Sequence, residues 1–156
     1  MRLVSLIGLL GTILVALQAH AAFWGLLGDS VENVTARDGV IAIDASTLVK
    51  TASRHYRYQE GAHTVKFFVV RDGQGTVRAA IDACEVCWRE GKGYTPKDGA
   101  MLCVNCGRKF PMHRIGLVAG GCNPHPFDFK VENDAVVIAT QELLLQGTRY
   151  FPGNTR

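Results

Sequence analysis

The sequence lacks the features that mark a disordered or a nucleic-acid-binding chain. It has no low-complexity tract, no internal repeat and no run of like charges, and only 20% of its 156 residues are charged. Hydrophobic residues make up 47% of the chain, which is enough for one domain with a packed core. The formal charge of +3 is spread along the sequence, so we expect no nucleic-acid partner.

Several catalytic patterns are also missing. The chain contains no Ser/His/Asp set, no phosphate-binding loop and no pair of spaced carboxylates that would support hydrolysis. Neither of its two Cys-x-x-Cys motifs is followed by histidine, because Trp88 and Gly107 stand at those positions, and this excludes covalent haem. The sequence therefore favours an electron carrier or a metal-binding accessory over an enzyme.

The N-terminus has the order of a secretory signal. A positive start precedes an almost wholly apolar stretch from Leu3 to Leu17, and residues 19–21 read Ala-His-Ala, with small residues where a signal peptidase cleaves. This stretch is shorter than the roughly 20 residues that span a bilayer. We predict a signal peptide over residues 1–21, cleavage after Ala21 and a periplasmic or otherwise exported protein. An uncleaved leader that tethers the protein to the membrane is the alternative.

The body of the chain is patterned mostly as β-strand. Alternating and β-branched runs predict strands over residues 40–43, 56–58, 63–70, 76–81, 127–131 and 135–139. In the strongest of these, Val65, Phe67 and Val69 should lie on one face and Phe68 and Val70 on the other. Weaker signals predict a brief helix capped by Asp29 or Ser30, a helical turn in residues 45–52, a short helix over 141–146 and a loose tail from Gly147.

All five cysteines fall between Asp82 and Asn123, in a glycine-rich and irregular segment that we expect to bury little apolar surface by itself. The pairs Cys84–Cys87 and Cys103–Cys106 are separated by 15 residues, a spacing typical of a thiolate metal site. Two residues between cysteines allow a tight turn to aim both sulfurs at one ion, and Gly107 supplies the positive φ that such turns often need. Zinc, iron and iron–sulfur centres all accept this ligand set.

The other residues near these pairs leave alternatives open. Cys122 lies between glycines and prolines, and it is a fifth ligand, a thiol beside the ligands or a buried cysteine with no metal role. His113 and His125 lie near the cysteines in the sequence and are alternative ligands. Asp82 ends a strand, hydrogen-bonds N–H groups of the loop, or lies beside the metal ligands, and the end of the strand is the favoured role. Disulfides and thiol–disulfide exchange are the alternatives to metal, although the two glycines that follow Trp88 oppose the helix usual after a redox motif.

Residues Tyr56 to Pro126 resemble a bacterial domain family described as membrane iron–sulfur containing, FtrD-like. The matching pieces, in order, are Lys66–Val70, Ala80–Cys87, Gly93–Tyr94, Met101–Gly107, Phe110, Ile115–Gly116 and Gly121–Pro124. The resemblance implies an iron or iron–sulfur centre in a cell-envelope protein that works beside a ferrous-iron permease. It carries the metal-site role over to Cys84, Cys87, Cys103, Cys106 and Cys122.

These inferences combine into one expected architecture and function. We expect a mainly β, single small domain over residues 22–150, with its core in 54–140, built from antiparallel hairpins and a rubredoxin- or zinc-ribbon-like metal loop; residues 151–156 form a flexible tail. One thiolate-bound metal centre, iron by resemblance or zinc, should serve electron transfer or metal handling in iron transport, with the permease or an envelope redox partner. A structural zinc site, a disulfide-stabilised binding protein and a thiol–disulfide oxidoreductase are the alternatives.

Overall fold

Three small β-sheets make up most of the computed structural model, which describes residues 30–152. The predicted leader lies outside the described residues, as do residues 153–156 of the predicted tail. Within residues 30–152, no helix has both the length and the apolar character needed to cross a membrane. The mainly β fold class predicted from the sequence is confirmed.

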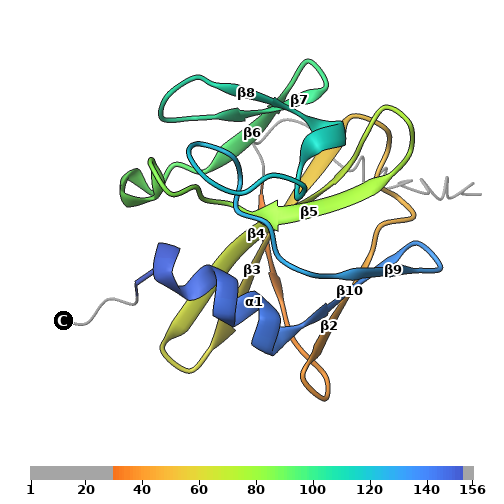
Figure 1. The fold of residues 1–156 in the computed structure, drawn as a ribbon. Coiled ribbons are helices and arrows are strands. Elements are labelled where there is room, and N and C mark those ends of the chain that lie inside the picture. The colour runs from red at the N-terminus through yellow and green to blue at the C-terminus, as the bar shows by residue number, and fades with distance from the viewer. Residues whose placement is uncertain (1–29, 153–156) are drawn as a thin grey trace, which may run out of the picture.

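The largest sheet has the strand order β1-β3-β4-β5 and occupies the centre of the molecule (Figure 1). Its strands are β1 (Val31–Val34), β3 (Ala52–Glu60), β4 (His63–Arg71) and β5 (Val77–Ile81). The antiparallel hairpins β3–β4 and β4–β5 match the prediction, whereas β1 pairs parallel with β3. The predicted helix after Ser30 is therefore wrong, because residues 31–34 pair along the edge of the sheet.

A second sheet, with the order β2-β10-β9, covers one face of the central sheet. It contains β2 (Val40–Asp44), β9 (Lys130–Glu132) and β10 (Ala135–Ala139), all antiparallel. Asn133 and Asp134, at the predicted turn, both have positive φ, as short hairpin loops require. Helix α1 (Thr140–Gly147) follows β10, which confirms the predicted short helix.

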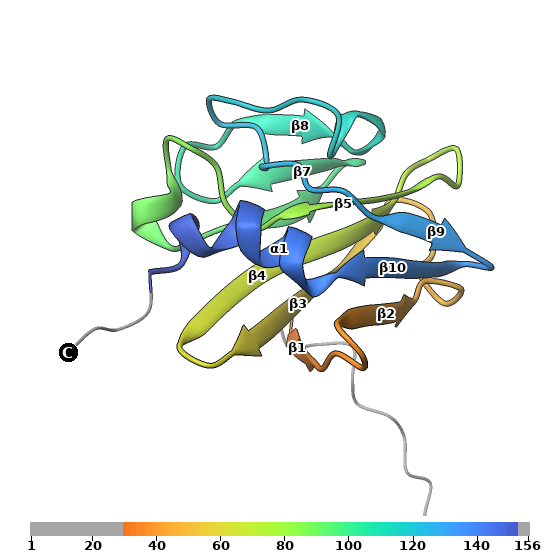
Figure 2. The ribbon, with the colours of Figure 1, turned by 60° about the horizontal axis from the view of Figure 1, so that its bottom comes forward.

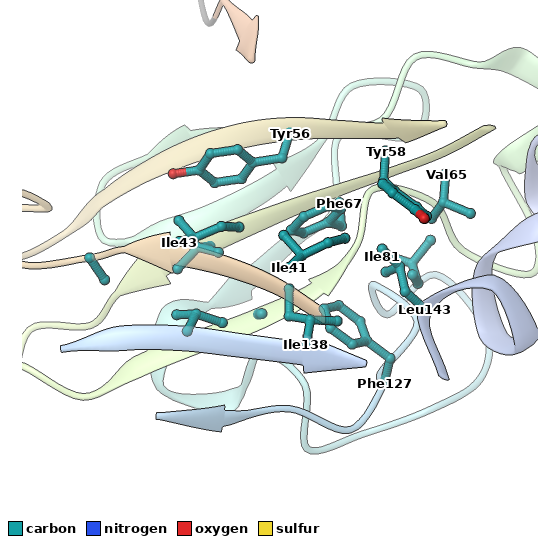
Figure 3. Close-up of a cluster of buried hydrophobic side chains, with 14 of the residues drawn as sticks. Ile41, Ile43, Tyr56, Tyr58, Val65, Phe67, Ile81, Phe127, Ile138 and Leu143 are labelled. Carbon is teal, nitrogen blue, oxygen red and sulfur yellow. The ribbon is translucent and has the colours of Figure 1, made fainter. Parts of the chain in front are cut away.

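The main core lies between these two sheets (Figure 3). Figure 3 shows Ile41 and Ile43 of β2 facing Tyr56 of β3 and Phe67 of β4 across the space between the sheets. Phe67 also meets Phe127 edge to face, with 5.9 Å between the ring centres. Complete burial of each such side chain contributes about 1.5–3 kcal/mol, so this half of the molecule has a core that is independent of the cysteines.

The third sheet lies on the opposite side of the central sheet from α1 (Figures 1 and 2). It contains β6 (Tyr94–Lys97), β7 (Ala100–Cys103) and β8 (Lys109–Pro111), which are joined in order as an antiparallel meander. The expectation that residues 82–123 are irregular is wrong, because the segment contains these three strands. Its apolar side chains are buried against the central sheet and not by the segment alone. A second core contains Met101 and Met112, both at most 1% exposed, against Phe68 and Val70. The two predicted faces of β4 thus belong to two different cores.

Two further expectations are corrected by long-range contacts. The predicted helical turn over residues 45–52 is wrong, because residues 45–51 form separate hydrogen-bonded turns and Ala52 begins β3. The Arg71 guanidinium donates hydrogen bonds of 2.7 Å to the carbonyls of Ala45 and Leu48 and ties this segment to β4. The chain after Gly147 is not loose either. The 3₁₀ turn η3 (Thr148–Tyr150) places Tyr150, 4% exposed, in the main core.

Candidate metal centre

The first cysteine pair begins three residues after β5 and forms a tight turn against the second core. The Cys87 amide donates to Cys84 Sγ at 3.2 Å, and the Trp88 amide donates to the Cys84 carbonyl at 3.2 Å. The short 3₁₀ turn η1 (Trp88–Glu90) follows and ends at Gly91 with φ +65°. Both sulfur-bearing residues are buried. An amide pointed at a sulfur stabilises the thiolate form that metals bind.

The second pair closes the hairpin between β7 and β8. The Cys103 amide donates to the Arg108 carbonyl at 2.9 Å, and the Gly107 amide donates back to the Cys103 carbonyl at 2.9 Å. Gly107 has φ +72°, as predicted from the sequence. Cys103 is buried in the second core, whereas Cys106 is exposed. The pair therefore runs from the interior to the surface of the molecule.

Cys122 comes from a third element, the loop that leads back to the main core. The Tyr94 hydroxyl donates a 2.6 Å hydrogen bond to the Cys122 carbonyl and holds this loop against β6. The Asn123 amide closes a turn onto the Gly120 carbonyl at 3.2 Å. Cys122 is partly buried and packs against the second core. Its placement depends on tertiary contacts.

All five thiols meet in one cluster, and none is in a disulfide. The sulfurs of Cys84, Cys87 and Cys122 lie within 4.8 Å of one another. The sulfurs of Cys87, Cys103 and Cys106 satisfy the same limit. Cys87 belongs to both groups, so its sulfur connects the two groups into one cluster of five cysteines. Such a set of soft donors matches zinc, iron or other thiophilic cations.

Burial makes two thiols of this cluster costly to ionise, those of Cys103 and Cys122. It raises the pKa of Cys103 to about 11 and that of Cys122 to about 12, where the adjacent Cys106 and Cys87 thiols add to the effect of burial. The exposed Cys106 differs, because the backbone N–H of Arg108 lowers its pKa. Burial, together with the Cys84 thiol, raises the pKa of Tyr94 and keeps its hydroxyl a donor. A bound cation would offset the cost of buried thiolate charge.

Asp82 links the cysteine pairs to the rest of the fold. Its Oδ1 accepts a 2.8 Å hydrogen bond from the Tyr94 amide, and its Oδ2 lies 3.4 Å from His55 Nδ1. Gly93 allows this approach, since a Cβ there would lie 2.6 Å from both carboxylate oxygens. The Gly93 carbonyl in turn accepts a hydrogen bond of 3.0 Å from the amide of Val104, which lies between the two cysteines of the second pair. Asp82 follows the end of β5 and accepts an N–H of the loop, so two of the roles considered for it are present.

The two histidines considered as ligands lie outside the sulfur groups. His125 is buried, with Nε2 3.3 Å from Gln146 Oε1 and 3.0 Å from an Arg149 nitrogen. His113 is exposed on the 3₁₀ turn η2 (Met112–Arg114). Neither belongs to a sulfur group within the described residues. Tyr94, which positions the Cys122 loop, was not predicted from the residue pattern. The adjacent Gly93 was the local sequence signal that the chain makes a close contact there.

Comparison with known proteins identifies a matching family. A family model described as FtrD-like, membrane iron-sulfur containing protein, matches residues 48–151, which include every cysteine of the cluster. No curated protein and no solved structure matches the chain.

Proposed function

This chain belongs to the FtrD-like family of membrane iron–sulfur containing proteins, and we propose from this premise that it is an exported, cell-envelope metal protein of iron transport. The observation that carries the proposal is the convergence of five sulfurs from three separate elements into two groups, each within 4.8 Å. The site residues are Cys84, Cys87, Cys103, Cys106 and Cys122. An iron centre held by these thiolates would supply one-electron chemistry.

The surroundings of the sulfurs support a redox or metal-handling role. Cys84 is only 1% exposed, so the Cys84 end of the cluster is shielded from solvent. Its sulfur accepts a hydrogen bond from the Cys87 amide, which would partly offset the charge of a thiolate there. Fixed N–H groups and burial are the features that tune the potential of a thiolate-bound metal. At the outer end, Cys106 reaches the surface. Electrons or ions would therefore enter and leave at the Cys106 end.

The partner we propose is an envelope redox protein or the ferrous-iron permease implied by the family resemblance. Two residues within the cysteine turns present apolar surface beside the cluster, since Val86 is 64% exposed and Val104 is 46% exposed. A partner that docked there would approach the sulfurs without crossing a protein layer. Export rests on the N-terminal leader, with cleavage after Ala21 and release into the periplasm as the expected outcome.

Two other functions compete for the same cluster. A structural zinc site would use the sulfurs only to hold the third sheet in place. Thiol–disulfide exchange is favoured by one observation, the exposed Cys106 beside the buried Cys103; the three-residue η1 turn after Cys87 offers little of the helix N-terminus that activates such thiols. Both alternatives predict a protein with no visible colour from iron.

The test is to isolate the full chain from the envelope under anaerobic conditions. Metal content by elemental analysis, visible absorption before and after dithionite, and free-thiol counting would be measured on the same sample. We expect iron, thiolate-to-iron absorption that bleaches on reduction, and no disulfide. Colourless protein with zinc would indicate the structural site, and oxidised cysteines without metal would indicate the disulfide alternatives.

Cys84→Ser is the informative variant, because Cys84 is buried and its sulfur accepts the amide of Cys87. We expect it to retain less metal than the unmodified chain. Val86→Ser is the matched control, since Val86 lies in the same turn but is exposed and carries no sulfur. If Cys84→Ser and Val86→Ser retained metal equally, the cluster would not be the binding site.

A further inference from the structure

The five sulfurs are arranged as two overlapping groups of three and not as a group of four. Cys84, Cys87 and Cys122 form one group, and Cys87, Cys103 and Cys106 form the other, each within 4.8 Å. Among residues 30–152, no four ligand atoms satisfy that limit together. A single ion held by the two Cys-x-x-Cys pairs would require the Cys84 sulfur to lie within the same limit of both sulfurs of the second pair. The structure does not place Cys84 in a group with Cys103 and Cys106.

Each group has the dimensions of a coordination sphere. A metal ion lies about 2.3 Å from each thiolate sulfur, which holds the sulfurs of one ion roughly 4 Å apart. Three sulfurs within 4.8 Å of one another can therefore share one ion. In a cubane cluster, by contrast, each cysteine binds a different iron, so the ligand sulfurs are spread farther apart than those on one ion. The compact groups favour ions that are bridged by a thiolate.

The charge of the thiolates also favours two ions over one. Five thiolates around one divalent ion would leave a large negative charge in a cluster whose two most buried cysteines, Cys84 and Cys103, are 1% and 2% exposed. Burying charge without a neutralising partner is strongly unfavourable. A second divalent ion would neutralise most of that charge. The number of ligands also agrees, since two ions with three thiolates each and one thiolate in common use all five cysteines.

We propose that the cluster holds two thiophilic metal ions that share the Cys87 thiolate. This inference rests on the proposed function, because it requires the thiols to bind metal. The inner ion is bound by Cys84, Cys87 and Cys122, and the outer ion by Cys87, Cys103 and Cys106. The outer ion exchanges more readily, because Cys106 is exposed whereas Cys84 is buried.

The test uses the full chain, reduced and freed of metal under anaerobic conditions, and titrated with ¹¹³Cd(II) as a spectroscopic probe. Native mass spectrometry counts the bound ions, and ¹¹³Cd NMR reports their ligands. We expect two cadmium ions per chain and two resonances in the thiolate region that are split by coupling through the shared sulfur. A chelator should remove the outer ion first.

The possible results separate this inference from the proposed function. One bound cadmium ion with a single resonance would overturn the two-ion centre while the metal-binding function stands. Two resonances without mutual coupling would overturn the shared Cys87 thiolate. No bound cadmium would overturn both proposals.

Variants give a second readout of the same arrangement. Cys122→Ser should lose the inner resonance and Cys106→Ser the outer one, each leaving one tightly bound ion. Cys87→Ser should weaken both. Val86→Ser, which changes an exposed side chain in the first turn, should bind two ions as the unmodified chain does. Loss of the same resonance in Cys122→Ser and Cys106→Ser would contradict the assignment.

Discussion

At the scale of single residues, the site depends on a few close contacts that no composition or spacing rule contains. The Asp82 carboxylate reaches the Tyr94 amide only because Gly93 has no side chain. Cys87 is central because its sulfur lies within 4.8 Å of the sulfurs of the other four cysteines. The spacing of the two Cys-x-x-Cys pairs was sufficient to predict that their sulfurs converge, and the structure brings them together. The spacing was insufficient to divide the cysteines into groups, because that division depends on how three separate loops meet.

Gly93→Ala tests the contact with Asp82. The new Cβ would lie 2.6 Å from the carboxylate oxygens at a φ of +64°, so we expect a loss of about 2 kcal/mol or more in the free energy of unfolding and weaker metal retention. Gly91→Ala is the control, with φ +65° but no atom within 4 Å of its Cβ, and should cost only about 1 kcal/mol. Equal losses in urea denaturation would show that the Asp82 contact contributes nothing.

Asp72 provides a pH-dependent test of stability away from the metal. Burial opposes its ionisation, but the amides of Thr76 and Gln74 and the Arg78 guanidinium outweigh burial and lower its pKa. A lowered pKa in the folded state stabilises the protein above the unfolded pKa of about 3.9, and this stabilisation is lost as the pH falls through the folded value. We expect Asp72→Asn to cost about 2 kcal/mol at pH 7 and progressively less below about pH 4. A cost that does not change with pH would contradict this account.

At the scale of elements, β4 was the best predicted part of the chain and the third sheet the worst. Alternation in β4 is strong enough to place Phe67 and Phe68 on opposite faces, and each is buried in a separate core. Strands β6, β7 and β8 are three or four residues long and contain Pro96 and Pro111, so they carry no alternating signal. They exist because pairing and Met101 burial stabilise them together, which is a tertiary effect.

Tyr94→Phe tests how β6 holds the Cys122 loop. The change removes the hydroxyl that donates to the Cys122 carbonyl at 2.6 Å, while the ring keeps its neighbours Phe68 and Phe110. We expect about 1 kcal/mol of lost stability and faster alkylation of Cys122 by iodoacetamide in the metal-free protein, measured by mass spectrometry. Tyr58→Phe, whose hydroxyl bonds Glu60 far from the cluster, should leave that rate unchanged. An unchanged rate in Tyr94→Phe would show that the loop is held by other contacts.

At the scale of the whole molecule, the fold consists of two cores on the two faces of one sheet, and only one core contains thiols. The main core, with Phe67, Ile138 and Leu143 fully buried, should remain stable without metal. Metal binding contributes folding energy where the ligands lie. We therefore expect that removing the metal speeds amide hydrogen exchange in residues 82–123 and leaves β2, β10 and α1 protected. Equal loosening of both halves would contradict this division.

X-ray absorption at the metal edge of the anaerobically isolated, full-length protein tests the central claim most directly. We predict a first coordination shell made of sulfur alone, at about 2.3 Å, with less bound metal in Cys84→Ser and an unchanged amount in Val86→Ser. A first shell of oxygen or nitrogen, or protein that contains five free thiols and no metal, would contradict the account.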